Sequence, residues 1–195
     1  KGITAGTGMD ALAHCIEAFS SPFYHPMAEG TAVEGLRLVK ENIQEVYHNG
    51  SNIEARAHML VASMMGAAAF QKGLGAIHSI THPVNSLYHT HHGTTNGTVM
   101  PFVLNFNRSV IENKFDRLAK FLNISNGFEG VVNWIIELKK EMEIPETLKE
   151  MGVKKGDEIK LAPLAQEDPS TGGNPLEMSE GKFQELILNC IEGNY

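Results

Sequence analysis

Residues 53–70 read IEARAHMLVASMMGAAAF, a stretch that is apolar on nearly every side when it is drawn as a helix. Gly66 and the alanines at 67–69 leave room for a neighbouring helix to approach closely. A helix that is hydrophobic all round is normally buried in the protein. We therefore predict that this segment is a central helix of a bundle.

The segments on both sides of this stretch also follow helical periodicity. Residues 27–47 carry apolar side chains three or four positions apart, as an amphipathic helix does. No segment alternates between apolar and polar residues as a strand does, and no repeat is present. We therefore predict an all-α helical bundle in which residues 1–195 form a single domain. The further helices are expected over residues 9–19, 77–88, 93–104, 115–122, 131–142 and 182–191.

The composition excludes several classes of function. The 195 residues carry a net charge of −7 and no Lys/Arg-rich stripe, so we expect no nucleic acid partner. No apolar run reaches the roughly 18–20 residues that span a bilayer, so we expect no membrane partner. Cys15 and Cys190 are too few for a disulfide framework, which favours a cytoplasmic protein. The chain starts at Lys1 without an initiator Met, and we interpret it as a piece of a longer protein.

Histidines and one aspartate form the pattern that carries chemistry. Asp10 and His14 lie four positions apart on a predicted helix, so both project from one face. His78 and His82 repeat this spacing, and His92 follows 14 residues after His78. One carboxylate with two or three imidazoles suits Fe(II) or Zn(II) better than Mg²⁺ or Ca²⁺, which prefer oxygen ligands. The alternative for each residue alone is an exposed, capping or packed side chain without a metal.

Other metal sites fit this pattern less well. Position 79 is Ser, so the His-x-x-x-His pair lacks the glutamate that acts as general base in zinc proteases. Repeated Glu-x-x-His pairs of a di-iron bundle are absent. No Gly-rich phosphate loop follows a predicted strand. A nucleotide, if the protein uses one, is therefore not bound by such a loop in this chain.

Four segments resemble signatures of the iron-containing (group III) alcohol dehydrogenases. The match runs through the chain in the order of that family. Its segments are TGMDALAH at 7–14, GLGAIHSITHP at 73–83, His92-Gly93 with Asn96 and Pro101, and Asp168 with Asn174-Pro175.

The resemblance implies a two-domain enzyme of which this chain is the second half. In that family a Rossmann-like N-terminal domain binds NAD or NADP, and a helical C-terminal domain of the dehydroquinate synthase-like type carries the metal. The resemblance makes Asp10, His14, His78 and His92 the ligands of Fe(II), with Zn(II) as the alternative metal. His91 stands beside His92 and is a second candidate, although the 14-residue spacing favours His92.

The same resemblance implies the roles of two further residues and the overall reaction. His82 corresponds to a histidine near the substrate that relays a proton, and Asp168 is expected to border the cofactor cleft. The reaction implied is hydride transfer between a small alcohol and its aldehyde or ketone, with the metal as Lewis acid. Partners implied are the substrate, the missing N-terminal domain and a second copy in a homodimer.

Three alternative functions remain. A dehydroquinate-synthase-like lyase and a glycerol-dehydrogenase-like enzyme would use zinc in a similar helical domain. A non-catalytic helical metal-binding module would bind metal without any dependence on His82. For the dehydrogenase we expect the chain to be inactive by itself, because the nucleotide-binding half is missing.

Overall fold

The computed structural model describes residues 1–195 and contains helices without strands, which confirms the predicted all-α class. Short 3₁₀ helices at Phe70–Lys72, Leu148–Met151 and Pro169–Gly173 connect some of the α-helices. The α-helices are α1 (Gly2–Ser20), α2 (Pro26–His48), α3 (Ile53–Ala69), α4 (Ala76–Tyr88), α5 (His92–Phe121), α6 (Gly127–Glu141), α7 (Glu158–Glu167) and α8 (Glu180–Glu192).

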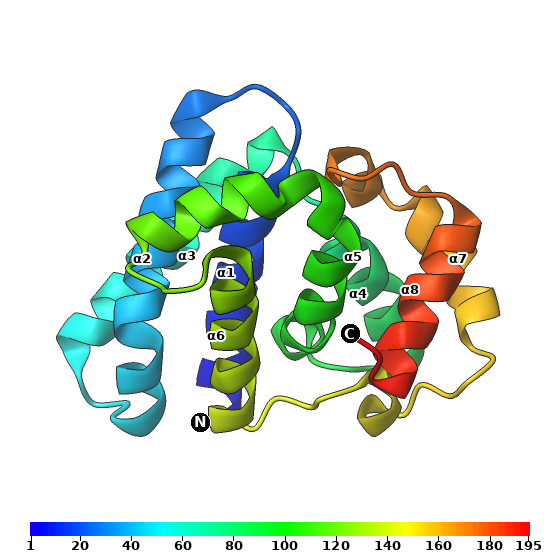
Figure 1. Ribbon diagram of the computed structural model, residues 1–195. Coiled ribbons are helices and arrows are strands. Elements are labelled where there is room, and N and C mark those ends of the chain that lie inside the picture. The colour runs from blue at the N-terminus through cyan, green and yellow to red at the C-terminus, as the bar shows by residue number, and fades with distance from the viewer.

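The central helix is α1, and not α3 as the sequence predicted. Helix α1 packs against α2, α3 and α5, and most of its side chains are buried. Helix α3 buries only small residues such as Ala62 and Gly66, whereas Ile53, Leu60 and Met64 are 75%, 73% and 64% exposed. The small side chains let α3 lie close to α1 and α2, but its outer stripe has no helix over it. Figure 1 shows α2 and α3 at one end of the molecule and α7 and α8 at the other.

Helix α5 is a single helix of 30 residues where the sequence predicted two separate helices. Pro101 lies inside it and supplies no N–H for the helical hydrogen bonds. Figure 1 shows that α5 changes direction along its length, as an internal proline allows. The first part of α5 contacts α1 and α4, and the helix also packs against α6 and α8. A long bent helix can therefore reach both ends of the bundle.

The first turn of α4 is held by side chains from distant parts of the chain. Its N-cap residue is Gly75, which has no side chain to accept a hydrogen bond. The amide of Ala76 donates instead to Asn174 Oδ1 at 3.1 Å, and the amide of Ile77 donates to Glu17 Oε1 at 2.7 Å. These two bonds satisfy donors that every helix leaves free at its start. They also fix the position of α4 against α1 and the C-terminal loop.

One hydrophobic core of 50 buried residues extends through all eight α-helices. No single helix is both long enough and apolar enough to cross a membrane. The segments Ile53–Lys72 and Ala76–Tyr88 meet that criterion only when they are taken together, and they are bent by 107° relative to each other.

Candidate metal centre

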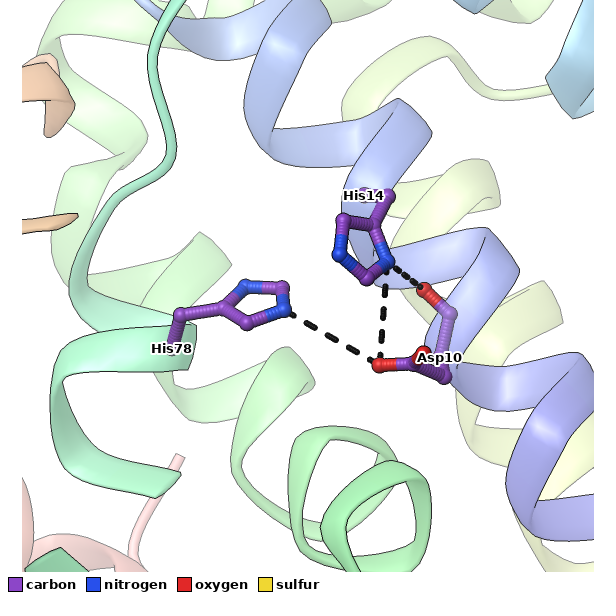
Figure 2. Close-up of side chains that lie close together, drawn as sticks. All are labelled: Asp10, His14 and His78. Atoms are coloured by element: carbon purple, nitrogen blue, oxygen red, sulfur yellow. Dashed lines mark hydrogen bonds and ion pairs between the residues drawn. The ribbon is translucent and has the colours of Figure 1, made fainter. Parts of the chain in front are cut away.

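Helices α1 and α4 bring three of the expected metal ligands together. Asp10 and His14 lie one turn apart on α1, and His78 reaches them from the first turn of α4. One possible ligand atom from each of the three residues lies within 4.8 Å of the other two. Figure 2 shows the three side chains directed toward one another from the two helices. This distance is short enough for one ion to contact all three.

His92, at the start of α5, joins the cluster through Asp10. Its Nε2 lies 3.2 Å from Asp10 Oδ1, and its ring centroid lies 5.3 Å from that of His78. His91 points elsewhere, because its Nδ1 accepts a hydrogen bond from the amide of Thr94 at 3.3 Å and caps α5. Of the two neighbouring histidines, His92 is thus the one that faces the carboxylate.

His82 lies one turn beyond His78 on α4 and borders the same cluster. Its ring stacks on that of His92, with centroids 5.5 Å apart and planes 17° apart. Its Nδ1 donates to Asp168 Oδ2 at 2.7 Å, while its side chain stays 42% exposed. The second oxygen of Asp168 accepts from the amide of Ser170. Asp168, which the resemblance assigned to the cofactor cleft, therefore lies against His82.

In all four imidazoles of the cluster, Nδ1 lies within hydrogen-bond distance of an oxygen. Nδ1 of His14 lies 2.8 Å from the backbone oxygen of Asp10, and Nδ1 of His92 lies 3.0 Å from Asn85 Oδ1. His78 and His82 use Nδ1 to contact Glu17 and Asp168. Since each acceptor is an oxygen, each Nδ1 carries the proton. In the neutral form of each ring Nε2 then carries no hydrogen, and this is the form that binds metals.

Glu17 is a residue of the candidate site that the sequence did not predict. Its carboxylate is 5% exposed, with Oε2 2.6 Å from His78 Nδ1 and Oε1 accepting from the amide of Ile77. A carboxylate behind a ligating histidine fixes its ring and makes it a stronger ligand. The available signal was its spacing, because Glu17 lies three residues after His14 and seven after Asp10, on the same helix face.

The charges of the cluster shift the pKa values of its members. Burial opposes the ionised form of Asp10, but the close contact with His92 and the charges of the nearby imidazoles lower its pKa overall. Burial also lowers the pKa of His14, partly offset by Asp10. Burial acts in the same direction on His78, yet the charge and hydrogen bond of Glu17, together with Asp10, raise the His78 pKa. Asp10 is therefore ionised and His14 uncharged at neutral pH, as metal ligands are.

Helices α1 and α5 approach so closely that only glycine fits between them. A Cβ placed on Gly93 would lie 1.9 Å from the backbone oxygen of Gly6 and 2.9 Å from Asp10 Cβ. Gly93 lies inside α5, so its missing side chain serves the contact between the two helices. This contact brings His92 to Asp10.

The donor set fits a divalent transition metal. It consists of one ionised carboxylate and three imidazoles with free Nε2 atoms, drawn from three helices around Asp10. Oxygen and nitrogen donors of this kind suit iron and zinc, and no thiolate is near enough to take part. Both cysteines are buried, and burial raises the pKa of the Cys15 thiol to about 12. The residues present therefore match the metal that the resemblance implies.

Comparison with known proteins gives a match over nearly the whole chain. The profile described as Fe-containing alcohol dehydrogenase family, C-terminal, matches residues 4–191. The 4-hydroxybutyrate dehydrogenase of Cupriavidus necator is 36% identical over 95% of this chain and 51% of its own length. The NAD-dependent methanol dehydrogenase of Bacillus methanolicus is 35% identical over 97% of this chain and 52% of its own length.

Solved structures agree with these matches. The crystal structure of a 1,3-propanediol oxidoreductase superposes with a TM-score of 0.91 at 30% identity, over 96% of this chain and 51% of that chain. The chain thus spans about half the length of the relatives it matches. These findings confirm the family resemblance drawn from the sequence.

Proposed function

From the premise that this chain belongs to the Fe-containing alcohol dehydrogenase family, we propose that it is the metal-binding domain of an NAD(P)-dependent alcohol dehydrogenase. The proposed reaction interconverts a small alcohol and its aldehyde or ketone. The names of the relatives support this class, since they include 4-hydroxybutyrate, 1,3-propanediol and methanol dehydrogenases.

We propose Asp10, His14, His78 and His92 as the metal ligands, with Fe(II) preferred over Zn(II). The observation that carries this proposal is that the three imidazoles surround Asp10, each with Nδ1 bonded to an oxygen. Nε2 of His78 and Nε2 of His92 face the Asp10 carboxylate at 3.9 and 3.2 Å. When bound, the ion supplies a Lewis acid that lowers the pKa of the alcohol oxygen. The carboxylate of Asp10 and the buried Glu17 provide negative charge to balance the cation.

We propose His82 as the residue that accepts the alcohol proton, at its free Nε2. Asp168 bonds its Nδ1, which orients the ring and stabilises the imidazolium that forms. The partial exposure of His82 gives the proton a route to solvent. The hydride goes to a nicotinamide, which we assign mainly to a Rossmann-like domain outside this chain. The exposed apolar stripe of α3, formed by Ile53, Leu60 and Met64, is a surface that such a domain can cover.

Metal content of the anaerobically purified chain tests the ligand assignment. We expect about one equivalent of iron or zinc by elemental analysis, and its loss in Asp10→Ala and His78→Ala. His25→Ala is the matched control, because His25 caps α2 and takes no part in the cluster. Equal metal content in His78→Ala and the unmodified chain would contradict the assignment.

Restoring the second half tests the activity. The chain alone should give no alcohol-dependent NADH formation, and fusion to the N-terminal half of a relative should restore it. In the fusion, His82→Ala should retain the metal and lose activity by about 100-fold or more, the usual contribution of a general base. Metal binding with full activity in His82→Ala would exclude His82 as the proton acceptor.

A further inference from the structure

Asn96 places its side-chain amide among three of the proposed ligand atoms. It lies on α5 one turn after His92 and is completely buried. Its Nδ2 lies 2.8 Å from Asp10 Oδ1, 3.2 Å from His78 Nε2 and 3.2 Å from His92 Nε2. No other side chain forms hydrogen bonds to all three of these atoms.

The chemistry of the neighbours fixes the orientation of this amide. The Asp10 carboxylate can only accept hydrogen bonds, and in the neutral rings of His78 and His92 the Nε2 atoms are acceptors because the proton lies on Nδ1. A rotated amide would direct its oxygen at three acceptors, so Nδ2 must face the cluster. The consequence is that Asn96 Oδ1 is buried without a hydrogen-bond partner. A buried polar atom without a partner is unusual and calls for a functional reason.

We propose that Asn96 is a positioning residue of the metal centre, which holds the ligands before the ion binds and orients Asp10 afterwards. This inference rests on the proposed function, since it takes Asp10, His78 and His92 as ligands. The amide has two hydrogens for three acceptors, so no single ligand atom is held permanently. With the Nε2 lone pairs engaged by a bound ion, Nδ2 would stay bonded to Asp10 Oδ1, which has a second lone pair to offer. The amide thereby selects the orientation of the carboxylate.

Metal titration of the 195-residue chain tests this role. Zn(II) affinity is measured by competition with a chromophoric chelator, and Co(II) absorption reports the ligand geometry. We expect Asn96→Leu, which matches the side chain in size but cannot donate, to bind Zn(II) about 10–100-fold more weakly, as for other residues that orient ligands. The Co(II) bands should shift in position or intensity. Asn96→Ala is the second variant, in case leucine prevents folding.

Thr98→Val is the matched control on the same helix. Thr98 is also completely buried, and its hydroxyl bonds the backbone oxygens of Thr94 and Pro145, away from the cluster. This variant should lower thermal stability and keep the Zn(II) affinity and the Co(II) spectrum. Unchanged affinity and spectrum in a folded Asn96 variant would overturn the positioning role and leave the proposed ligands standing. Failure of the unmodified chain to bind either metal would overturn the ligand assignment and this inference with it.

Discussion

Single side chains decide the protonation of the imidazoles in this molecule. A histidine binds a metal through whichever nitrogen lacks a proton, and the hydrogen bond at the other nitrogen determines which one that is. His78 gives the clearest case, because its ring is buried and its Nδ1 meets the carboxylate of Glu17 at 2.6 Å. The same carboxylate accepts from the amide of Ile77. Glu17 therefore holds the first turn of α4 in place and also determines which nitrogen of His78 carries the proton.

Glu17→Gln should weaken metal binding by about 10–100-fold. Glutamine has one acceptor oxygen, and the fixed amide of Ile77 retains it. The glutamine NH₂ then faces His78 Nδ1, which either loses its partner or passes its proton to Nε2. Competition titration with Zn(II) measures the loss of affinity.

Glu29→Gln is the control for this substitution. The Glu29 side chain bonds Lys72 and Lys114 and forms no hydrogen bond or ion pair with the histidines of the cluster, so its loss should reduce stability and leave affinity unchanged. If Glu17→Gln binds Zn(II) as tightly as the unmodified chain, Glu17 serves only to anchor α4.

At the scale of elements, the position of the candidate site depends on how closely α1 and α5 cross. The crossing occurs at Gly6 and Gly93, where the backbones touch and no Cβ fits. Asp10 follows Gly6 by one turn on α1, and His92 directly precedes Gly93 on α5. A change in the distance between these helices therefore separates two proposed ligands. The glycines act on the site without contacting any ion themselves.

Gly93→Ala should destabilise the fold and weaken metal binding together. The added Cβ would overlap the backbone oxygen of Gly6, and the overpacking should cost about 1–3 kcal/mol of unfolding free energy. Denaturant unfolding and Zn(II) titration measure the two effects. Gly30→Ala in α2 is the control, since nothing lies within 4 Å of its Cβ, and it should gain about 0.5–1 kcal/mol. Unchanged Zn(II) affinity in Gly93→Ala would separate the helix crossing from the site.

At the scale of the whole molecule, a buried cation joins α6 to α5 and to the loop that follows α6. Lys139 on α6 is 2% exposed, and its Nζ donates to the backbone oxygens of Thr98 and Glu146. Burial lowers the pKa of Lys139 to about 8, against the opposing influence of nearby negative groups. The folded protein therefore releases this proton at a lower pH than the unfolded chain, in which a lysine titrates near 10.5.

The Lys139 contribution to stability should increase as the pH rises from about 8 to 10.5. In that range the unfolded chain binds more protons than the folded protein, so its unfolding free energy rises with pH, by up to about 3 kcal/mol. Below pH 8 the cost of the buried charge is constant. The measurement is denaturant unfolding of the unmodified chain and Lys139→Met across this range. Burial raises the pKa of both cysteine thiols, which lowers the stability of either protein as the pH rises, and this effect cancels in the difference between the two proteins. A difference that does not depend on pH would show that Lys139 keeps its ordinary pKa.

The sequence by itself determined the class of fold and the residue types of the candidate site. Helical periodicity and the absence of alternating segments depend only on neighbours along the chain, so the all-α class could be predicted without the structure. The spacing of Asp10 with His14 and of His78 with His82 placed each pair on one helix face for the same reason. Residues 53–70 misled the prediction of the central helix, because apolarity alone does not say which face of a helix another helix covers.

Only the tertiary structure decided which residues meet across the helices. Glu17 behind His78, Asn96 among the ligand atoms and Asp168 against His82 are separated from their partners by 61, 18 and 86 positions. Such contacts depend on the distances and angles at which helices pack, and these are set by the fit of many side chains at once. Periodicity shows the direction of a side chain on its own helix, and the packing of α1, α4 and α5 supplies the partner.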